Sequence, residues 1–285
     1  MSNLLTRMIT GLRRTTGLKA ARLARATAPL SGYQEHRQEI PFVDPLSDED
    51  LAELNGLLRW QAFTVDRHGR RFGGVAWKGK RDQAQPIPDR RIELMNQRFG
   101  LTGKQVLEVG CFEGIHTVGL SRLGAQVTAV DGRIENVTKT IVRTALYGCY
   151  PRVFKYDVEQ VPADTALLQA DLLHHVGVLY HLRDPVRHLL DIGQYIRLGL
   201  MLDTHYASVE DAHLQYEVQG KNYAYKPYRE LGYEDAFSGL YPHSKWLPLD
   251  SIVGLLRQTG FRQVEIVETR QERNGPRVLL FASRM

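Results

Sequence analysis

The sequence predicts an α/β protein built around a doubly wound, mostly parallel sheet. A short apolar run, Val106–Val109, leads through a glycine-containing turn and a helical pattern to a second apolar run, which ends at Asp131. Three more apolar runs follow further along the chain, at residues 152–156, 170–176 and 198–203. Strand patterns that alternate with helical patterns favour a parallel sheet with helices on both faces.

The turn after the first strand is a candidate ligand-binding loop. It contains Gly110 and Gly114, and glycine allows the backbone to approach a ligand closely. The helix that follows offers unpaired N–H groups at its N-terminus. Asp131 stands about twenty residues further on, where a carboxylate can accept hydrogen bonds from the two hydroxyls of a ribose. This unit therefore points to a cofactor that contains a nucleoside.

The spacing of the loop distinguishes between cofactors. Residues 108–114 read E-x-G-x-x-x-G, whereas a dinucleotide-binding loop reads G-x-G-x-x-G. The loop resembles motif I of the class I S-adenosylmethionine-dependent methyltransferases. That resemblance implies S-adenosylmethionine as the cofactor, with its amino-acid part facing the loop residues Glu108, Gly110, Cys111 and Gly114. The family more often has glycine where Phe112 stands, and we expect the Phe112 ring to be directed away from the methionine moiety.

The adenine end of the cofactor is expected beside the next two strands. The third strand ends at Asp157, and the resemblance implies that this carboxylate accepts the adenine amino group while the N–H of Val158 meets the ring. Arg133, just after Asp131, is placed to flank the adenine. The alternatives are a surface role for Arg133 at the start of a helix and a helix-capping role for Asp157.

A second motif follows the fourth strand. Residues 177–185, GVLYHLRDP, resemble a methyltransferase group that includes tRNA wobble-uridine carboxymethyltransferases and small-molecule and glycan O-methyltransferases. There the segment lies beside the transferring methyl. The resemblance places Gly177 at the cofactor and Tyr180 where it would orient the acceptor. His181 becomes the candidate general base, since histidine titrates near neutral pH, and His205 is a second candidate. A purely structural role is the alternative for both histidines.

The carboxymethyltransferases in this group use a carboxylated cofactor. An arginine late in the chain helps to bind its carboxylate, and the sequence alone does not single out that arginine.

A long, tyrosine-rich segment, residues 206–246, follows the fifth strand. Long insertions are often lids or binding loops, and tyrosine suits sugar rings or bases. We expect an acceptor-binding insertion that uses four residues: Tyr206, Tyr225, Lys245 and Trp246. The alternative is a small antiparallel extension whose tyrosines merely pack. Residues 73–81 are basic and aromatic. This segment is either a lid, in which Trp77 and Lys78 contact the cofactor or the acceptor, or a surface loop.

Three segments make up the predicted domain organisation: a basic leader at 1–30, a helical and lid extension at 31–99, and the methyltransferase domain at 100–285. The leader either contacts an anionic membrane surface or nucleic acid as a peripheral helix, or is solvated; a cleaved targeting peptide is also compatible. The domain closes with a helical pattern at 251–259 and strands at 261–268 and 278–282. The resemblance implies that the last strand inserts antiparallel, which completes a Rossmann-like sheet of seven strands.

Composition indicates the cellular compartment of the protein and whether it is expected to span a membrane or bind a metal. The chain has 285 residues and a formal net charge of +5. It contains no apolar run near the roughly 18 residues that a membrane span needs. Two cysteines are typical of a reducing, cytoplasmic compartment. The histidines lack a tight H-x-x-H spacing, so we expect no bound metal.

The function predicted from these observations is O-methylation of a sugar or other small-molecule hydroxyl, with a histidine taking the proton. A tRNA-modifying methyltransferase or carboxymethyltransferase is the first alternative, because of GVLYHLRDP and the basic leader. A non-catalytic protein that keeps the cofactor fold is the second.

Overall fold

The computed structural model describes residues 36–74, 83–160 and 164–284. The chain forms two compact units. One comprises the N-terminal part up to Ile87 together with residues 142–149, and the other comprises residues 88–141 and 150–285. The predicted leader and the candidate pair Trp77 and Lys78 lie outside the described residues.

The described part of the N-terminal unit contains a helix and a small hairpin, in addition to residues 142–149. Helix α2 (Asp48–Leu57) begins where Ser47 Oγ accepts a hydrogen bond from the N–H of Asp50. Its acidic first turn suits the positive end of the helix dipole. Strands β1 (Phe63–Val65) and β2 (Arg71–Gly73) pair antiparallel.

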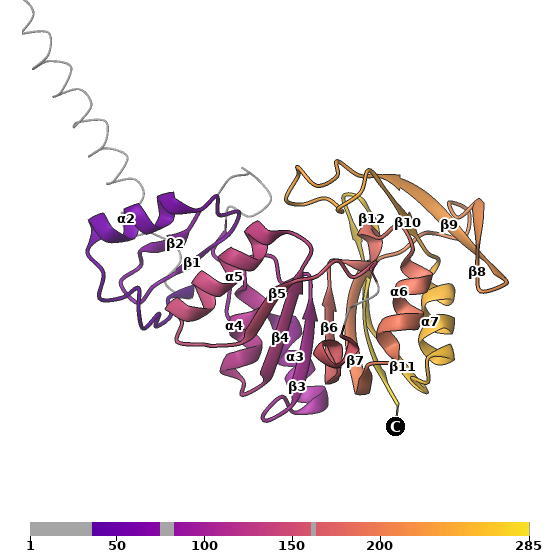
Figure 1. Ribbon diagram of the computed structural model, residues 1–285, viewed down its shortest axis with the longest axis horizontal. Helices are drawn as coiled ribbons and strands as arrows, with labels where there is room; N and C mark the ends of the chain where they lie inside the picture. The colour runs from indigo at the N-terminus through magenta and orange to yellow at the C-terminus, as the bar shows by residue number, and fades with distance from the viewer. Residues whose placement is uncertain (1–35, 75–82, 161–163, 285) are drawn as a thin grey trace, which may run out of the picture. The chain divides into compact units, whose positions relative to one another are not determined.

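The larger unit contains a seven-stranded sheet in the order β11–β12–β7–β6–β3–β4–β5 (Figure 1). The five strands from β3 to β7 are parallel, and β12 inserts antiparallel between β11 and β7. This confirms the predicted α/β class with its antiparallel last strand. The strands are β3 (Gln105–Val109), β4 (Gln126–Asp131), β5 (Arg152–Lys155), β6 (Ala170–Val176), β7 (Ile196–His205), β11 (Gln263–Glu272) and β12 (Gly275–Ser283).

Helices cover both faces of this sheet. Helices α3 (Arg90–Phe99) and α4 (Ile115–Arg122) share one apolar core with alternate strand residues such as Val106. Helices α6 (Pro185–Gly193) and α7 (Leu249–Gln258) share the other, which includes Leu107. Side chains alternate between the faces of a strand, so β3 is apolar almost throughout. Helix α5 (Ile134–Leu146) follows β4.

The tyrosine-rich segment forms a second, three-stranded antiparallel sheet in the order β10–β9–β8. Its strands are β8 (Leu214–Val218), β9 (Lys221–Arg229) and β10 (His243–Trp246). The N–H of Lys245 bonds to the carbonyl of Leu182, which ties β10 to the segment after β6. The segment between β9 and β10, residues 230–242, is called the cover loop below.

Among the described residues, no helix combines the length and the apolar character needed to cross a membrane.

Candidate active site

The loop after β3 requires glycine at two positions. Gly110 and Gly114 have φ values of 71° and 77°, in the left-handed region. A Cβ on Gly114 would lie 3.0 Å from the backbone Cα of Thr140, and one on Gly110 would collide with Val178. Side chains are therefore excluded on steric grounds at both glycines.

Phe112 shares the left-handed conformation, with φ 52°. This explains why a glycine is the more usual residue here, because a Cβ makes this conformation costly. The N–H of Phe112 donates to Asp131 Oδ2 at 3.1 Å, which fixes the turn. Its ring lies 5.5 Å from that of Phe237 in the cover loop. The expected direction of the ring relative to the methionine moiety stays a prediction.

Asp131 is a buried carboxylate at the end of β4. Its Oδ1 accepts from the N–H of Arg133 at 2.9 Å and from the amide of Asn136 at 3.1 Å, in addition to the Phe112 bond on Oδ2. Burial raises the pKa of Asp131, and these donors partly oppose that rise. A carboxylate has about four acceptor positions, so it retains capacity for a ribose hydroxyl. Together, the glycine turn and this carboxylate fit the cofactor predicted from the sequence.

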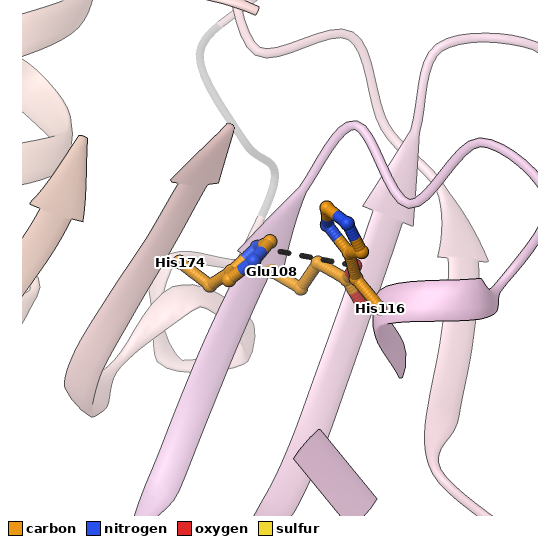
Figure 2. Close-up of side chains that lie close together, drawn as sticks. All are labelled: Glu108, His116 and His174. Carbon is orange, nitrogen blue, oxygen red and sulfur yellow. Dashed lines mark ion pairs between the residues drawn. The ribbon is translucent and has the colours of Figure 1, made fainter. Parts of the chain in front are cut away.

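Glu108 lies on β3 beneath the loop, and it forms a cluster with the buried His174 of β6 and the partly buried His116 of α4 (Figure 2). Thr117 Oγ1 donates to its Oε2 at 2.6 Å, and His174 Nδ1 is 3.9 Å from its Oε1. Burial, with the nearby charge of Asp131, raises the pKa of Glu108 to about 8. Glu108 is therefore largely protonated at neutral pH.

The same three side chains offer donor atoms within 4.8 Å of one another, a spacing that suggests a metal. Arg91 argues against this interpretation. Its Nη2 lies 3.2 Å from His116 Nε2, while its Nε donates to Asp89 at 2.7 Å and its Nη1 to Asp203 at 3.4 Å. A divalent ion here would be repelled by a guanidinium already in contact with one ligand. We interpret the group as a buried polar network.

Glu108→Gln is expected to change how stability depends on pH. Because the folded-state pKa of Glu108 lies above the usual 4.5, the folded protein holds a proton that the unfolded chain releases between pH 4.5 and about 8. As the pH rises across that window, the free energy of unfolding of the wild type should therefore fall by about 1.4 kcal/mol per pH unit relative to that of Glu108→Gln. Denaturant unfolding at pH 5 to 8 measures the difference. Glu53→Gln, an exposed carboxyl on α2, is the control, and parallel curves for wild type and Glu108→Gln would contradict the expectation.

His181 sits in a short 3-10 helix, Leu179–His181, directly after β6. Its Nδ1 lies 2.8 Å from Oε1 of Glu230, the first residue of the cover loop. A carboxylate only accepts hydrogen bonds, so Nδ1 carries a hydrogen, and in the neutral ring the lone pair is then on Nε2. The described residues provide no hydrogen-bond partner for Nε2, and the side chain is 19% exposed. His181 thus has the arrangement of a general base held by a carboxylate.

The carboxylate of Glu230 is itself held by three further donor groups. Its Oε2 accepts from Ser238 Oγ at 2.6 Å and from the N–H of Gly239 at 3.0 Å, and Ser244 Oγ donates to Oε1 at 2.9 Å. Burial favours the neutral acid, but His181, Ser238 and Gly239 outweigh it and lower the pKa of Glu230. The carboxylate is therefore charged at neutral pH and fixed in one orientation.

Tyr180 and His205 lie beside His181 within an aromatic cluster. The rings of Tyr180 and His181 are 4.1 Å apart, and the Tyr180 ring meets His205 edge-on at 4.7 Å. His205 stacks on Trp246, and Trp246 stacks on Tyr228. His205 Nδ1 is 3.1 Å from the carbonyl of Pro276, and burial lowers its pKa. His205 is more enclosed than His181, which makes it the weaker candidate base.

The other predicted acceptor residues have partners within the protein. Trp246 is only 1% exposed. Lys245 Nζ donates to the carbonyl of Arg183, and Tyr225 meets Tyr216 edge-on at 5.3 Å. Tyr206 is half-buried. The contacts of Trp246, Lys245 and Tyr225 describe packing within the insertion, and acceptor binding by the set stays a prediction.

Arg277 of β12 lies close to the predicted transfer position. Its guanidinium carbon is 5.5 Å from the centre of the Tyr180 ring, and a Cβ on Gly177 would be 3.8 Å from Nη2. Arg277 pairs with the fully buried Asp203 of β7. Asp203 also binds Arg91 of α3 and Arg270 of β11, at 3.4 and 3.0 Å. One carboxylate thus joins four elements.

The cover loop contacts the segments that follow three other strands. Tyr241 OH donates to Asp157 Oδ2 at 2.7 Å, after β5. The Arg133 guanidinium, after β4, donates to carbonyls of the loop, including Ser238 at 3.0 Å and Gly239 at 3.2 Å. A Cβ on Gly239 would lie 2.6 Å from the carbonyl of His181, after β6. The carbonyl of Val158 accepts from His188 Nδ1 at 3.2 Å, and the adenine contact of the Val158 N–H stays a prediction.

Sequence reasoning missed Glu230, Ser238 and Arg277. Glu230 is 49 residues from His181 along the chain, and no spacing pattern links them. The only indication was that Glu230 falls within the long insertion predicted to return to the pocket.

Comparison with known proteins now identifies the class. A family model described as a methyltransferase domain matches residues 80–266. The chain belongs to this family of S-adenosylmethionine-dependent methyltransferases, as its sheet and glycine loop predict.

Three similar proteins illustrate the relationship. The tRNA U34 carboxymethyltransferase of Citrifermentans bemidjiense is 28% identical over 63% of this chain and 59% of its own length. That of Idiomarina loihiensis is 28% identical over 81% of this chain and 66% of its own length. The solved N-terminal domain of EvdMO1 with S-adenosylhomocysteine is 25% identical, with a TM-score of 0.66 over 82% of this chain and 94% of that domain. The chain thus spans about three fifths of the first of these relatives.

Proposed function

We propose that this methyltransferase alkylates a hydroxyl oxygen, with His181 as the base that removes the hydroxyl proton. The observation that carries the proposal is the 2.8 Å contact between His181 Nδ1 and Glu230 Oε1. It directs Nε2 away from Glu230, and the side chain of His181 is 19% exposed. When the proton arrives on Nε2, the charge of Glu230 stabilises the resulting imidazolium.

S-adenosylmethionine supplies an electrophilic alkyl group on a positively charged sulfur when it is bound. The residues of this chain must bind it, align the acceptor and hold the base. Gly110, Gly114 and Asp131 are assigned to binding. Tyr180, whose ring lies between those of His181 and His205, is assigned to alignment of the acceptor. A protein that only bound the cofactor would have no use for the Glu230–His181 pair.

For the acceptor, we favour a wobble uridine of tRNA and a carboxylated cofactor. The names of the two curated relatives support this choice over the small-molecule hydroxyl predicted first from the sequence. Arg277 supports it independently, because it is a late arginine whose guanidinium lies beside Tyr180 and Gly177. A guanidinium is well suited to bind a carboxylate. Because the base takes a proton from oxygen, the uridine must carry a hydroxyl.

A sugar hydroxyl with unmodified S-adenosylmethionine is the second candidate. It is supported by the structural likeness to the EvdMO1 domain. The likeness covers 94% of that domain, whose structure was solved with S-adenosylhomocysteine. The packed tyrosines of the insertion give it no additional support.

One experiment separates the two candidates. Mass spectrometry of the purified protein identifies any bound nucleoside, and the protein is then incubated with each cofactor and either tRNA that carries a hydroxylated wobble uridine or D-fucose. We expect carboxymethyl transfer to tRNA, with binding that weakens steeply as salt rises. Methyl transfer to the sugar alone would assign the second candidate. Transfer to neither, by protein that binds S-adenosylhomocysteine, would contradict both.

A further inference from the structure

We infer that Arg133 is a positioning residue for the catalytic base, and that it acts through the cover loop. The inference rests on the proposed function of His181. It assigns Arg133 a task other than the adenine contact predicted from the sequence, because the guanidinium is directed at the loop.

The first step of the argument is the geometry of Arg133. Its backbone N–H donates to Asp131 Oδ1 at 2.9 Å, so its position is set by the ribose-binding turn. Its Nε–H donates to the carbonyl of Tyr233 at 3.1 Å, and the two hydrogens of Nη2 are shared among four further carbonyls of the cover loop at 2.9–3.2 Å, those of Gly232, Asp235, Ser238 and Gly239. Such convergence of carbonyls on one guanidinium fixes the path of a loop that lacks regular secondary structure.

The second step links that loop to the base. Ser238 and Gly239, whose carbonyls bind Arg133, also donate their Oγ–H and N–H to Oε2 of Glu230. Glu230 Oε1 in turn holds His181 Nδ1. A continuous series of hydrogen bonds therefore runs from Asp131 through Arg133 and the loop to His181.

Two neighbouring contacts require the loop to keep this path. Gly132 is packed so closely against Leu240 that a Cβ would collide with that side chain. Gly239 approaches the carbonyl of His181 equally closely, since a Cβ would lie 2.6 Å from that oxygen. Among the described residues, Arg133 is the side chain that contacts these five carbonyls together, while those of Gly232 and Asp235 also accept from N–H groups of the loop. We therefore expect the loss of Arg133 to loosen the alignment of Ser238 and Gly239 on Glu230.

The test uses Arg133→Met, which keeps the aliphatic stem and removes every donor, and Arg133→Lys, which keeps the charge and loses the planar fork. Both retain the backbone N–H that binds Asp131. Protein labelled with ¹⁵N-histidine reports the tautomer of His181 by NMR, with His181→Ala used to assign its signals. Calorimetry with S-adenosylhomocysteine reports cofactor affinity. Arg187→Met is the matched control, because the Arg187 side chain is half-exposed and, among the described residues, forms its ion pair with Asp191 on its own helix.

We expect wild type and Arg187→Met to show His181 with hydrogen on Nδ1. Both Arg133 variants should show exchange between the two tautomers, with the Kd for S-adenosylhomocysteine changed less than threefold. A wild-type His181 spectrum in both variants would overturn the inference. So would a Kd raised tenfold or more, because that result assigns Arg133 to the cofactor. If Arg133→Met does not fold, the His181 spectrum and the Kd of Arg133→Lys decide whether the inference holds.

This test does not depend on the acceptor. If the transfer assays contradict the proposed function, the tautomer of His181 and the affinity for S-adenosylhomocysteine can still be measured. Conversely, His181 can prove to be the base while Arg133 proves not to position it.

Discussion

Asp131→Ala is expected to raise the Kd for S-adenosylhomocysteine at least about 100-fold, which corresponds to roughly 3 kcal/mol. The carboxylate is the acceptor assigned to the ribose, and charged hydrogen bonds contribute about 1.5–3 kcal/mol each. It also accepts from Phe112, Arg133 and Asn136, so its loss leaves buried donors unpaired and loosens the glycine turn. Calorimetry of the wild type and the variant measures the effect.

A second variant separates binding from turn geometry. Asp131→Asn keeps the shape of the side chain, but its NH₂ group faces one of the N–H donors that the carboxylate accepts from. We therefore expect a similar loss of affinity for S-adenosylhomocysteine. Asp191→Asn provides the control, because the Asp191 carboxylate forms an ion pair with the half-exposed Arg187 on the same helix. Thermal melting establishes that each variant is folded. A folded Asp131→Ala protein that binds S-adenosylhomocysteine within threefold of the wild type would remove Asp131 from the cofactor site.

His181→Ala is expected to lower kcat by about 10²–10⁴-fold, the usual contribution of a general base, and to leave the affinity for S-adenosylhomocysteine unchanged. The reason is that His181 contacts Glu230 and Tyr180 but not the glycine turn or Asp131. Single-turnover assays with the acceptor identified above measure the chemical step separately from product release.

Glu230→Gln should produce an intermediate loss, because the amide can still accept from Nδ1 but no longer offers a charge to the imidazolium. His213→Ala is the matched control, since His213 is exposed and binds only a neighbouring carbonyl. Full activity of the His181→Ala variant would exclude His181 as the base and would leave His205 as the candidate.

Much of the fold could be predicted because its causes are local. The strand and helix periods around the glycine turn identified β3, α4 and β4, and Asp131 follows from its place at a strand end. The same reasoning located His181 after β6. These features depend on residues that are near one another in sequence, where period and spacing are informative.

The partners of these residues could not be predicted. Glu230 reaches His181 only because β9 and β10 form a separate sheet, and Arg133 turns toward the cover loop because that loop presents its carbonyls there. Trp246 illustrates the opposite case. Its aromatic character suggested acceptor binding, yet its ring is almost wholly buried between His205 and Tyr228. Residue type alone does not distinguish a packed ring from an open one.

Asp203 has a consequence for the order in which the protein folds. The carboxylate lies on β7 and is fully buried, and its arginine partners come from α3, before the first sheet strand, and from β11 and β12, after all the parallel strands. During synthesis the parallel strands emerge while Asp203 still lacks Arg270 and Arg277. Burying the charge without these two arginines is costly, so we expect β7 to become fully buried only when the last hairpin, β11 and β12, has formed. The region around Arg277 and His205 is then expected to be the last part of the sheet to be completed.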